Sequence, residues 1–224
     1  MGVASPKLEA LAATAGKQGW AAGSGDVESV RKQAAQLGWV EVAPRRGDPA
    51  VSVLRPSGPE AAHRSSLSAV YGLGQQPLHT DGAHVQAPPD VLVFISEHPT
   101  VTPTQLWRPG FRGRRRGPPY MSAAALAHGM FLVRSGRDSF YAPALSGSYY
   151  RYDPGCMTPC DARAQEVQEY FDQQLSHASA HEWPAAGQVL VVDNRRALHA
   201  RPAVAEGDLE RELTRIAFRT GTAP

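Results

Sequence analysis

The sequence predicts a mainly β fold with flanking helices. Short segments of alternating or continuously apolar residues recur along the chain, as in half-buried and fully buried strands. The 224 residues include 19 prolines and 21 glycines, which indicate many turns and favour strands over a helix bundle. Helical patterns are confined to four segments, two of them near the N-terminus.

The composition indicates an ordinary globular protein. Hydrophobic residues make up 42% of the chain and charged residues 20%, and the length suits one domain. We expect a single domain over residues 1–224, in which helices and strands of residues 1–70 pack on a core of residues 71–219 that carries the motifs.

Charge, hydropathy and cysteine count set expectations for partners. The formal net charge of +2 gives no reason to expect a nucleic-acid partner. No apolar run approaches membrane-spanning length, and the N-terminus lacks the layout of a signal peptide. Two cysteines argue against a disulfide framework. We therefore expect a cytoplasmic protein with no membrane partner.

The N-terminal part is expected to alternate helices and strands. Asp26 is a suitable N-cap, with Val27, Val30 and Ala34 forming an apolar stripe after it. The expected helices are Pro6–Ala15 and Asp26–Leu37, and the expected strands are Trp39–Val42, Val51–Leu54 and a segment around His79.

The rest of the chain is expected to be richer in strands. Asp161 is a suitable N-cap for the clearest helix, which has apolar residues at helical spacing. The expected helices are Met121–His128 and Asp161–Gln174, and the expected strands are Val91–Ser96, Met130–Arg134, Ser139–Ala142, Gly187–Val192 and Glu212–Phe218.

One segment, Arg108–Pro119, is strongly basic. It contains five arginines among glycines and prolines. A nucleic-acid patch is one interpretation. A mobile, solvated loop is favoured, because no aromatic ladder supports base stacking and the rest of the chain is not basic.

The tripeptide His79-Thr80-Asp81 is a candidate metal-binding motif. Residues i and i+2 of a strand point to the same side, so His79 and Asp81 can reach one ion. A third ligand, His199, follows a buried strand and the turn dipeptide Asp193-Asn194. Two imidazoles and one carboxylate form the facial ligand set of non-haem Fe(II) oxygenases. The alternative is a core histidine whose ring is satisfied by Asp81.

The last expected strand carries a row of arginines. Arg211, Arg215 and Arg219 share one face of an extended segment. If this face points inward, at least one arginine needs an anion, because an unpaired buried charge is costly. A dicarboxylate would supply it, since guanidinium binds carboxylate in a bidentate manner. The alternative is a basic row that faces solvent.

Other candidate sites are weaker. A zinc site is conceivable from Cys156, Cys160, His177 and His181, but an expected helix fills the gap between the two pairs. His84 either lines the pocket beside Asp81 or is an ordinary packed or exposed histidine. No G-x-S-x-G motif is present and neither cysteine has a nucleophile signature, which argues against a hydrolase.

Three motifs in this order resemble the Fe(II)/2-oxoglutarate-dependent dioxygenases of the taurine dioxygenase and clavaminate synthase-like superfamily. The resemblance spans about Tyr71 to Arg219 and implies a double-stranded β-helix, or jelly roll. The motifs are Leu78–Asp81 followed by Pro88-Pro89, then Asp193–Arg201, then Arg211–Arg215, with further similarity at Arg151–Gly155 and Trp183–Gly187.

Transferred to this chain, the resemblance implies His79, Asp81 and His199 as iron ligands. It implies Arg211 as the partner of the distal carboxylate of 2-oxoglutarate. Arg215 would support that carboxylate or bind a substrate anion.

Relatives often add a hydroxyl to this carboxylate site from a G-G-x-T-x-W-like segment. The corresponding stretch here, Thr102–Trp107, departs from that pattern, and Thr104 or Gln105 would take the role.

The resemblance also implies the reaction. The cofactor would be Fe(II), with 2-oxoglutarate and O2 as co-substrates and release of succinate and CO2. The substrate would be a small molecule, such as an amino acid or natural-product intermediate, that is hydroxylated, desaturated or cyclised. Alternatives are a non-catalytic binding module on the same fold and a nucleic-acid-directed oxidative demethylase.

Overall fold

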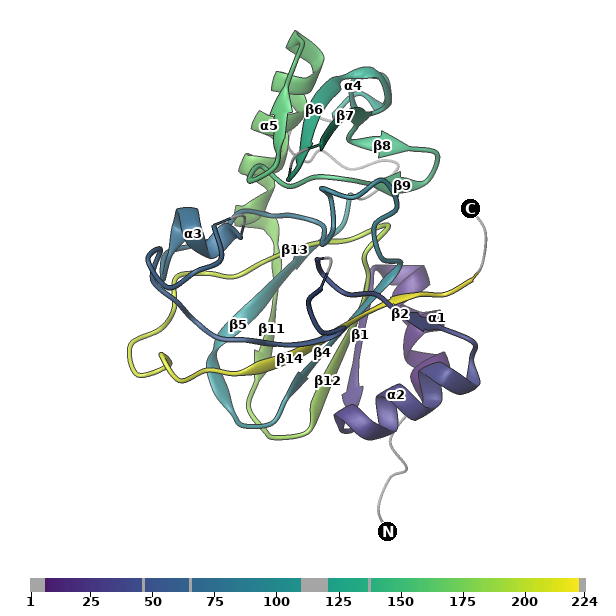
Figure 1. Cartoon of the computed structure of the whole chain (residues 1–224), viewed down its shortest axis with the longest axis vertical. Coiled ribbons are helices and arrows are strands. Elements are labelled where there is room, and N and C mark those ends of the chain that lie inside the picture. The colour runs from purple at the N-terminus through teal and green to yellow at the C-terminus, as the bar shows by residue number, and fades with distance from the viewer. Residues whose placement is uncertain (1–6, 46, 65, 110–120, 137, 222–224) are drawn as a thin grey trace.

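Two antiparallel sheets form the centre of the molecule (Figure 1). This computed structural model describes residues 7–45, 47–64, 66–109, 121–136 and 138–221. The larger sheet has the order β1-β12-β4-β14-β2, with β3 also paired to β14, and the smaller has the order β11-β5-β13. The predicted mainly β, jelly-roll fold class is confirmed.

The strands of the large sheet come from distant parts of the chain. They are β1 (Trp20–Ser24), β2 (Val40–Glu41), β3 (Val51–Leu54), β4 (Val91–Ser96), β12 (Gln188–Asp193) and β14 (Leu213–Arg219). The small sheet consists of β5 (Thr100–Trp107), β11 (Ser179–Trp183) and β13 (Leu198–Ala200).

Both faces of the large sheet are covered, which explains why every residue of β4 is buried. Along β4, Val93 and Ile95 pack with α1 (Leu8–Gln18) and α2 (Val27–Gln36) on the outer face. Leu92 and Phe94 point the other way, into an apolar layer that includes Leu106 and Trp183 of the small sheet. A strand buried on both sides reads as a continuous apolar run, as this one does.

The two N-terminal helices form as predicted, with shifted ends. Asp26 caps α2 by accepting a hydrogen bond from the Ser29 backbone N–H at 2.8 Å, and the Ser29 hydroxyl completes a capping box. Val30 and Ala34 are buried against the large sheet. Figure 1 shows both helices on one side of that sheet.

A third apolar cluster joins the small sheet to the elements drawn at the top of Figure 1. Its buried residues include Phe131, Tyr152 and Phe171. The elements here are α4 (Ala123–His128), β6 (Met130–Ser135), β7 (Asp138–Pro143), β8 (Leu145–Ser146), β9 (Tyr149–Tyr150), β10 (Met157–Pro159) and α5 (Ala162–Gln174), which continues into a 3-10 turn (Leu175–His177). Asp161 caps α5, as predicted.

Some strands were not predicted. Strand β1 is made of small residues after Trp20, and β5 contains Pro103. The pairing of β5 with β11 shifts register between His181 and Trp183, and a proline is tolerated at such an irregularity. Strands β11 and β13 were also missed.

The predicted strand around His79 is wrong. His79 forms only an isolated bridge to His199, and α3 (Leu67–Tyr71) precedes this segment. Residues 110–119 of the arginine-rich segment lie outside the described residues. Within the described part of the chain, no helix is both long and apolar enough to cross a membrane.

Candidate metal centre

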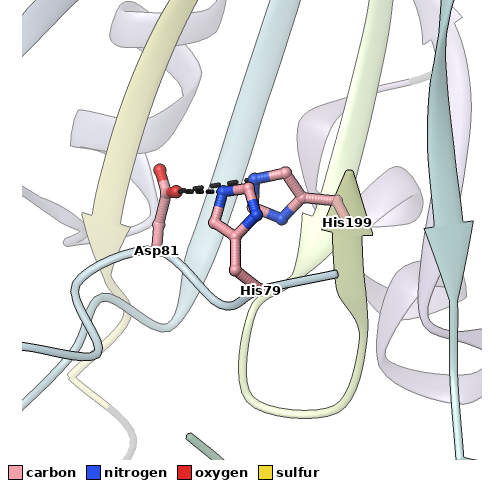
Figure 2. A group of neighbouring side chains, drawn as sticks. All are labelled: His79, Asp81 and His199. Atoms are coloured by element: carbon pink, nitrogen blue, oxygen red, sulfur yellow. Dashed lines mark ion pairs between the residues drawn. The ribbon is translucent and has the colours of Figure 1, made fainter. Parts of the chain in front are cut away.

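The three predicted metal ligands come together in the structure. His199 lies on β13, and its backbone N–H and C=O both pair with His79 at 2.9 Å. Asp81 follows two residues after His79. Figure 2 shows the two imidazole rings and the Asp81 carboxylate pointing toward one another. Among the described residues this is the group of His, Cys, Asp and Glu side chains whose ligand atoms converge, all within 4.8 Å.

The spacing of the ligand atoms suits one ion. Asp81 Oδ1 lies 3.6 Å from His79 Nε2 and 3.4 Å from His199 Nε2. Two atoms that each lie about 2.1 Å from a common ion are at most about 4.2 Å apart. His79 Nδ1 lies 3.0 Å from the Pro77 carbonyl and must donate to it, so the Nε2 lone pair faces Asp81. The donor set therefore fits a divalent metal.

The ionisation of Asp81 and His199 also favours binding of a cation at this site. Burial opposes ionisation of Asp81, but Arg215 and the two histidines hold its pKa well below the usual range. Burial and the neighbouring His79 lower the pKa of His199, which favours the neutral, ligand-competent ring. Burial lowers the pKa of His79 as well, but Asp81 and Asp153 outweigh it and the net shift is upward.

The Asp81 carboxylate is shared between the histidines and an arginine. Arg215 Nη1 contacts Asp81 Oδ2 at 2.6 Å, and Arg215 Nε donates to Ser52 Oγ at 3.3 Å. Oδ2 is thereby occupied, and Oδ1 is the oxygen that faces the imidazoles. The sequence did not predict this ion pair, and the substrate-binding role of Arg215 stays a prediction.

The backbone of Asp81 is held by Asn194, which follows β12. The Asn194 side chain accepts from the Asp81 N–H at 2.9 Å and donates to the Asp81 carbonyl at 2.9 Å. It also donates to the Pro89 carbonyl at 2.8 Å and is almost fully buried. The Asn194 amide thus makes the hydrogen bonds to the Asp81 backbone that a neighbouring strand would otherwise make. Sequence reasoning treated Asn194 as a turn residue and missed this role.

Two arginines fix the loops on either side of the motif. Arg201 donates to the carbonyls of Gly72 and Gly74, before His79. Arg151 donates to the carbonyls of Ala83 and Val85, after Asp81. The segment around His79 and Asp81 has no regular secondary structure. These side-chain hydrogen bonds therefore replace the backbone hydrogen bonds that would hold a regular strand.

Replacing Asn194 with alanine should weaken metal binding. The change leaves the Asp81 backbone without partners, which should cost roughly 2–3 kcal/mol of unfolding free energy and about 10- to 100-fold in metal affinity. Equilibrium dialysis and chemical denaturation measure the two effects. Gln174→Ala is the control, because it also truncates a buried amide, at the end of α5. An equal loss of metal affinity in both variants would contradict a specific role for Asn194.

A cavity of about 470 Å³ adjoins the three ligands. This volume lies in the range of small-molecule sites, roughly 300–1,000 Å³. The predicted inward face of the last strand lines it, through Arg211, Leu213, Arg215, Ala217 and Arg219. The alternative of a solvent-facing basic row is therefore wrong for Arg211 and Arg215, whereas Arg219 is exposed.

Arg211 is a buried cation without an ionic partner. Its side chain lines the cavity, its Nε has no hydrogen-bond partner, and no ion pair among the described residues involves it. Burial lowers the pKa of Arg211 to about 10 although the charge of Asp208 acts in the opposite direction, so Arg211 remains charged at neutral pH. Its backbone N–H donates to the Asp208 carbonyl, and Asp208 is anchored to the small sheet by Thr100 Oγ1 at 2.6 Å and the Thr102 N–H at 2.9 Å.

Only some of the remaining candidate residues from the sequence lie at the cavity. Thr104 and His84 line the cavity, whereas Gln105 is not among its lining residues. Asp153 also lines it, beside the motif, and was not singled out from the sequence. The zinc alternative is wrong for the described residues, since Cys156, Cys160, His177 and His181 form no converging group.

Comparison with known proteins supports the fold through structure alone. The sequence matches no protein-family model and no curated protein. An asparagine oxygenase in complex with Fe(II), 2S,3S-3-hydroxyasparagine and succinate is similar with a TM-score of 0.66 and 19% identity, over 87% of this chain and 65% of that one.

Two further solved structures are similar. The non-heme iron oxygenase OrfP in complex with Fe and alpha-ketoglutaric acid has a TM-score of 0.60 at 21% identity, over 86% of this chain and 64% of that chain. PvcB, an Fe, alpha-ketoglutarate dependent oxygenase from an isonitrile synthetic pathway, has a TM-score of 0.62 at 17% identity, over 93% and 78% of the two chains.

This chain thus spans somewhat less than two thirds of the asparagine oxygenase and OrfP chains. The TM-scores of 0.60 to 0.66 nevertheless show that the three proteins share the fold of this chain. The chain has the jelly-roll fold of the Fe- and alpha-ketoglutarate-dependent oxygenases.

Proposed function

We propose that this protein is an Fe(II)- and 2-oxoglutarate-dependent oxygenase that oxidises a small molecule. The observation that carries the proposal is a two-part site in one cavity. Converging His79, Asp81 and His199 side chains suit a divalent metal, and the buried, unpaired Arg211 suits a carboxylate. When bound, Fe(II) and 2-oxoglutarate supply the oxidising chemistry with O2, and succinate and CO2 are released.

In this proposal each residue has a binding or orienting task. His79, Asp81 and His199 would hold the iron, since two imidazoles and one carboxylate are the ligand set of non-haem Fe(II) oxygenases. Arg215 keeps Asp81 Oδ2 engaged at 2.6 Å, so that Asp81 offers one oxygen to the metal. Arg211 and Thr104 bind the distal carboxylate of 2-oxoglutarate. Bidentate pairing with that carboxylate would give the buried Arg211 charge the direct ion pair that it lacks among the described residues.

For the substrate we propose a small zwitterion such as an amino acid. Asp153 lines the cavity, where its carboxylate accepts from the Gly155 N–H at 2.8 Å and interacts with the Cys156 thiol, and its negative charge suits an ammonium group. Arg215 Nη2 has no partner among the described residues and suits the substrate carboxylate. The structurally similar asparagine oxygenase and OrfP hold hydroxylated amino acids in their complexes.

Turnover of 2-oxoglutarate tests the proposal. The purified protein, given Fe(II), 2-oxoglutarate and O2, should form succinate, and the rate should rise with one or more members of an amino-acid panel. The Asp81→Ala variant should form none. The proposal would fail if succinate never formed in an Fe(II)-dependent manner and Fe(II) did not promote 2-oxoglutarate binding.

Substituting Asp153 by asparagine should impair substrate recognition selectively. The variant keeps the shape and the hydrogen bond to Gly155 but loses the charge that pairs with an ammonium group. We expect the KM of the amino-acid substrate to rise about 10-fold or more, since hydrogen bonds to charged groups contribute roughly 1.5–3 kcal/mol. Affinities for Fe(II) and 2-oxoglutarate should not change. An unaltered KM would remove Asp153 from the substrate site.

We also propose that residues 1–224 act as one domain in the cytoplasm. The packing of α1 and α2 on the large sheet supports the first point. The free thiols of Cys156 and Cys160 support the second.

A further inference from the structure

The hydroxyl of Thr104 is constrained by a buried indole. Trp183 Nε1 lies 3.1 Å from Thr104 Oγ1, and the Trp183 side chain is fully buried. An indole N–H only donates hydrogen bonds, so the threonine oxygen must accept. This contact fixes the direction in which Thr104 uses its hydroxyl.

The hydroxyl proton of Thr104 is available for a hydrogen bond to a ligand in the cavity. Among the described residues, Trp183 is the hydrogen-bond partner of Thr104 Oγ1, and it occupies an acceptor position. Thr104 is 5% exposed and lines the same cavity as Arg211. A hydroxyl that accepts from one side is polarised to donate on the other. The cavity therefore contains an oriented neutral donor as well as a buried guanidinium that has no ion pair among the described residues.

Trp183 is itself held in place. The ring of His181 packs against its indole edge to face, with centroids 4.5 Å apart and an interplanar angle of 89°. The indole also belongs to the apolar layer between the two sheets, together with Phe94 and Leu213. Trp183 is not among the residues that line the cavity, so any effect on a ligand must pass through Thr104.

We propose that Trp183 is a positioning residue for the co-substrate. Its indole N–H orients the Thr104 hydroxyl as a fixed donor to the dicarboxylate whose far carboxylate binds Arg211. The inference rests on the proposed function for the identity of that dicarboxylate, but the orientation of the hydroxyl does not depend on iron chemistry.

A double-mutant cycle tests this role. Thr104→Val removes the hydroxyl and should weaken 2-oxoglutarate binding about 10-fold or more, as expected for a hydrogen bond to a charged group. Trp183→Phe keeps an aromatic ring but loses the N–H, and should weaken binding in the same direction. The combined variant should bind no more weakly than Thr104→Val alone, because both changes remove one interaction.

Matched variants and readouts isolate the effect. Trp107→Phe alters another buried tryptophan, on β5 and outside the cavity lining, and should bind 2-oxoglutarate like the wild type. Thr104→Ser keeps the hydroxyl and should restore most of the affinity. Calorimetry with Mn(II) in place of Fe(II) measures dicarboxylate binding without turnover, and Mn(II) affinity should be the same in every variant.

A readout on the wild-type protein covers the case in which Trp183→Phe does not fold. Adding 2-oxoglutarate or succinate should shift the Trp183 indole N–H resonance and leave that of Trp107 in place. The role of Trp183 is overturned if that resonance does not move, if Trp183→Phe binds like the wild type, or if its effect adds to that of Thr104→Val.

Succinate separates this inference from the proposed function. If the wild type binds succinate with the expected variant pattern but shows no metal-promoted 2-oxoglutarate binding, the proposed function fails and the positioning role stands. If the wild type binds neither dicarboxylate, the positioning role is overturned as well.

Discussion

Replacing Asp81 with alanine should abolish stoichiometric Fe(II) binding. Asp81 supplies the only carboxylate of the converging group, and Arg215 holds it with Oδ1 toward the histidines. Two imidazoles alone lack the third ligand and the negative charge that complete the iron site. Iron content after anaerobic reconstitution and desalting measures the effect. Asp153→Asn is the matched control, since it removes another cavity carboxylate and should keep its iron.

The same substitution should also destabilise the fold, which must be separated from the loss of iron. Without Asp81 the largely buried Arg215 loses its ionic partner, and breaking such a pair costs roughly 3–5 kcal/mol. The double variant Asp81→Ala/Arg215→Met removes both charges and should recover much of that stability while still binding no iron. Retention of iron by either variant would exclude Asp81 as a ligand.

Replacing Arg211 with methionine should weaken 2-oxoglutarate binding by about 100-fold, equivalent to roughly 2.7 kcal/mol. Arg211 is the buried arginine of the cavity without an ion-pair partner among the described residues, whereas the neighbouring Arg201 donates to the carbonyls of Gly72 and Gly74. Iron affinity should stay within a few fold of the wild type. Calorimetric titration of the Mn(II)-loaded protein gives both affinities.

Arg211→Met should at the same time stabilise the ligand-free protein. Burial lowers the pKa of Arg211 to about 10, which means that the charged form is disfavoured in the folded state. Replacing a buried charge that has no direct ion pair by an apolar side chain often raises the unfolding free energy, here by roughly 1–3 kcal/mol. Arg219→Met is the control, because Arg219 lies on the same face of β14 but is exposed. A destabilised Arg211→Met protein that binds 2-oxoglutarate normally would contradict this role.

The large sheet and the helices on it were accessible from the sequence because their patterns are local. The run Val91–Ser96 is apolar throughout, since one face meets α1 and α2 and the other meets the small sheet. Asp26 and Asp161 marked helix starts through capping, which depends on three or four neighbouring residues. The small sheet carries no such signal, because the proline in β5 is tolerated only through the register shift in its partner β11.

The sequence predicted the three metal ligands but not the residues that hold them in place. The spacing of His79, Asp81 and His199 indicated a shared ion, and the structure brings their ligand atoms together. The strand expected around His79 does not form, so the reason given for the common side of His79 and Asp81 was wrong. Asn194 performs that task through long-range contacts with the Asp81 backbone, which no local pattern encodes.

The roles of the arginines were also only partly predictable from the sequence. Alternation along the last strand correctly placed Arg211 and Arg215 at the cavity, although Arg211 precedes β14 and Arg219 at its end is exposed. It could not distinguish Arg215, which pairs with Asp81, from Arg211, which has no anion. That difference depends on where Asp81 lies in three dimensions.

The most direct test is an anaerobic optical titration of the wild-type protein with Fe(II) and 2-oxoglutarate. A weak visible charge-transfer band should appear only when both are present, and it should be absent in Asp81→Ala and His79→Ala. Arg211→Met should require a much higher 2-oxoglutarate concentration to produce it. The central claim is contradicted if saturating Fe(II) and 2-oxoglutarate give no band, or if the band is unchanged in the ligand variants.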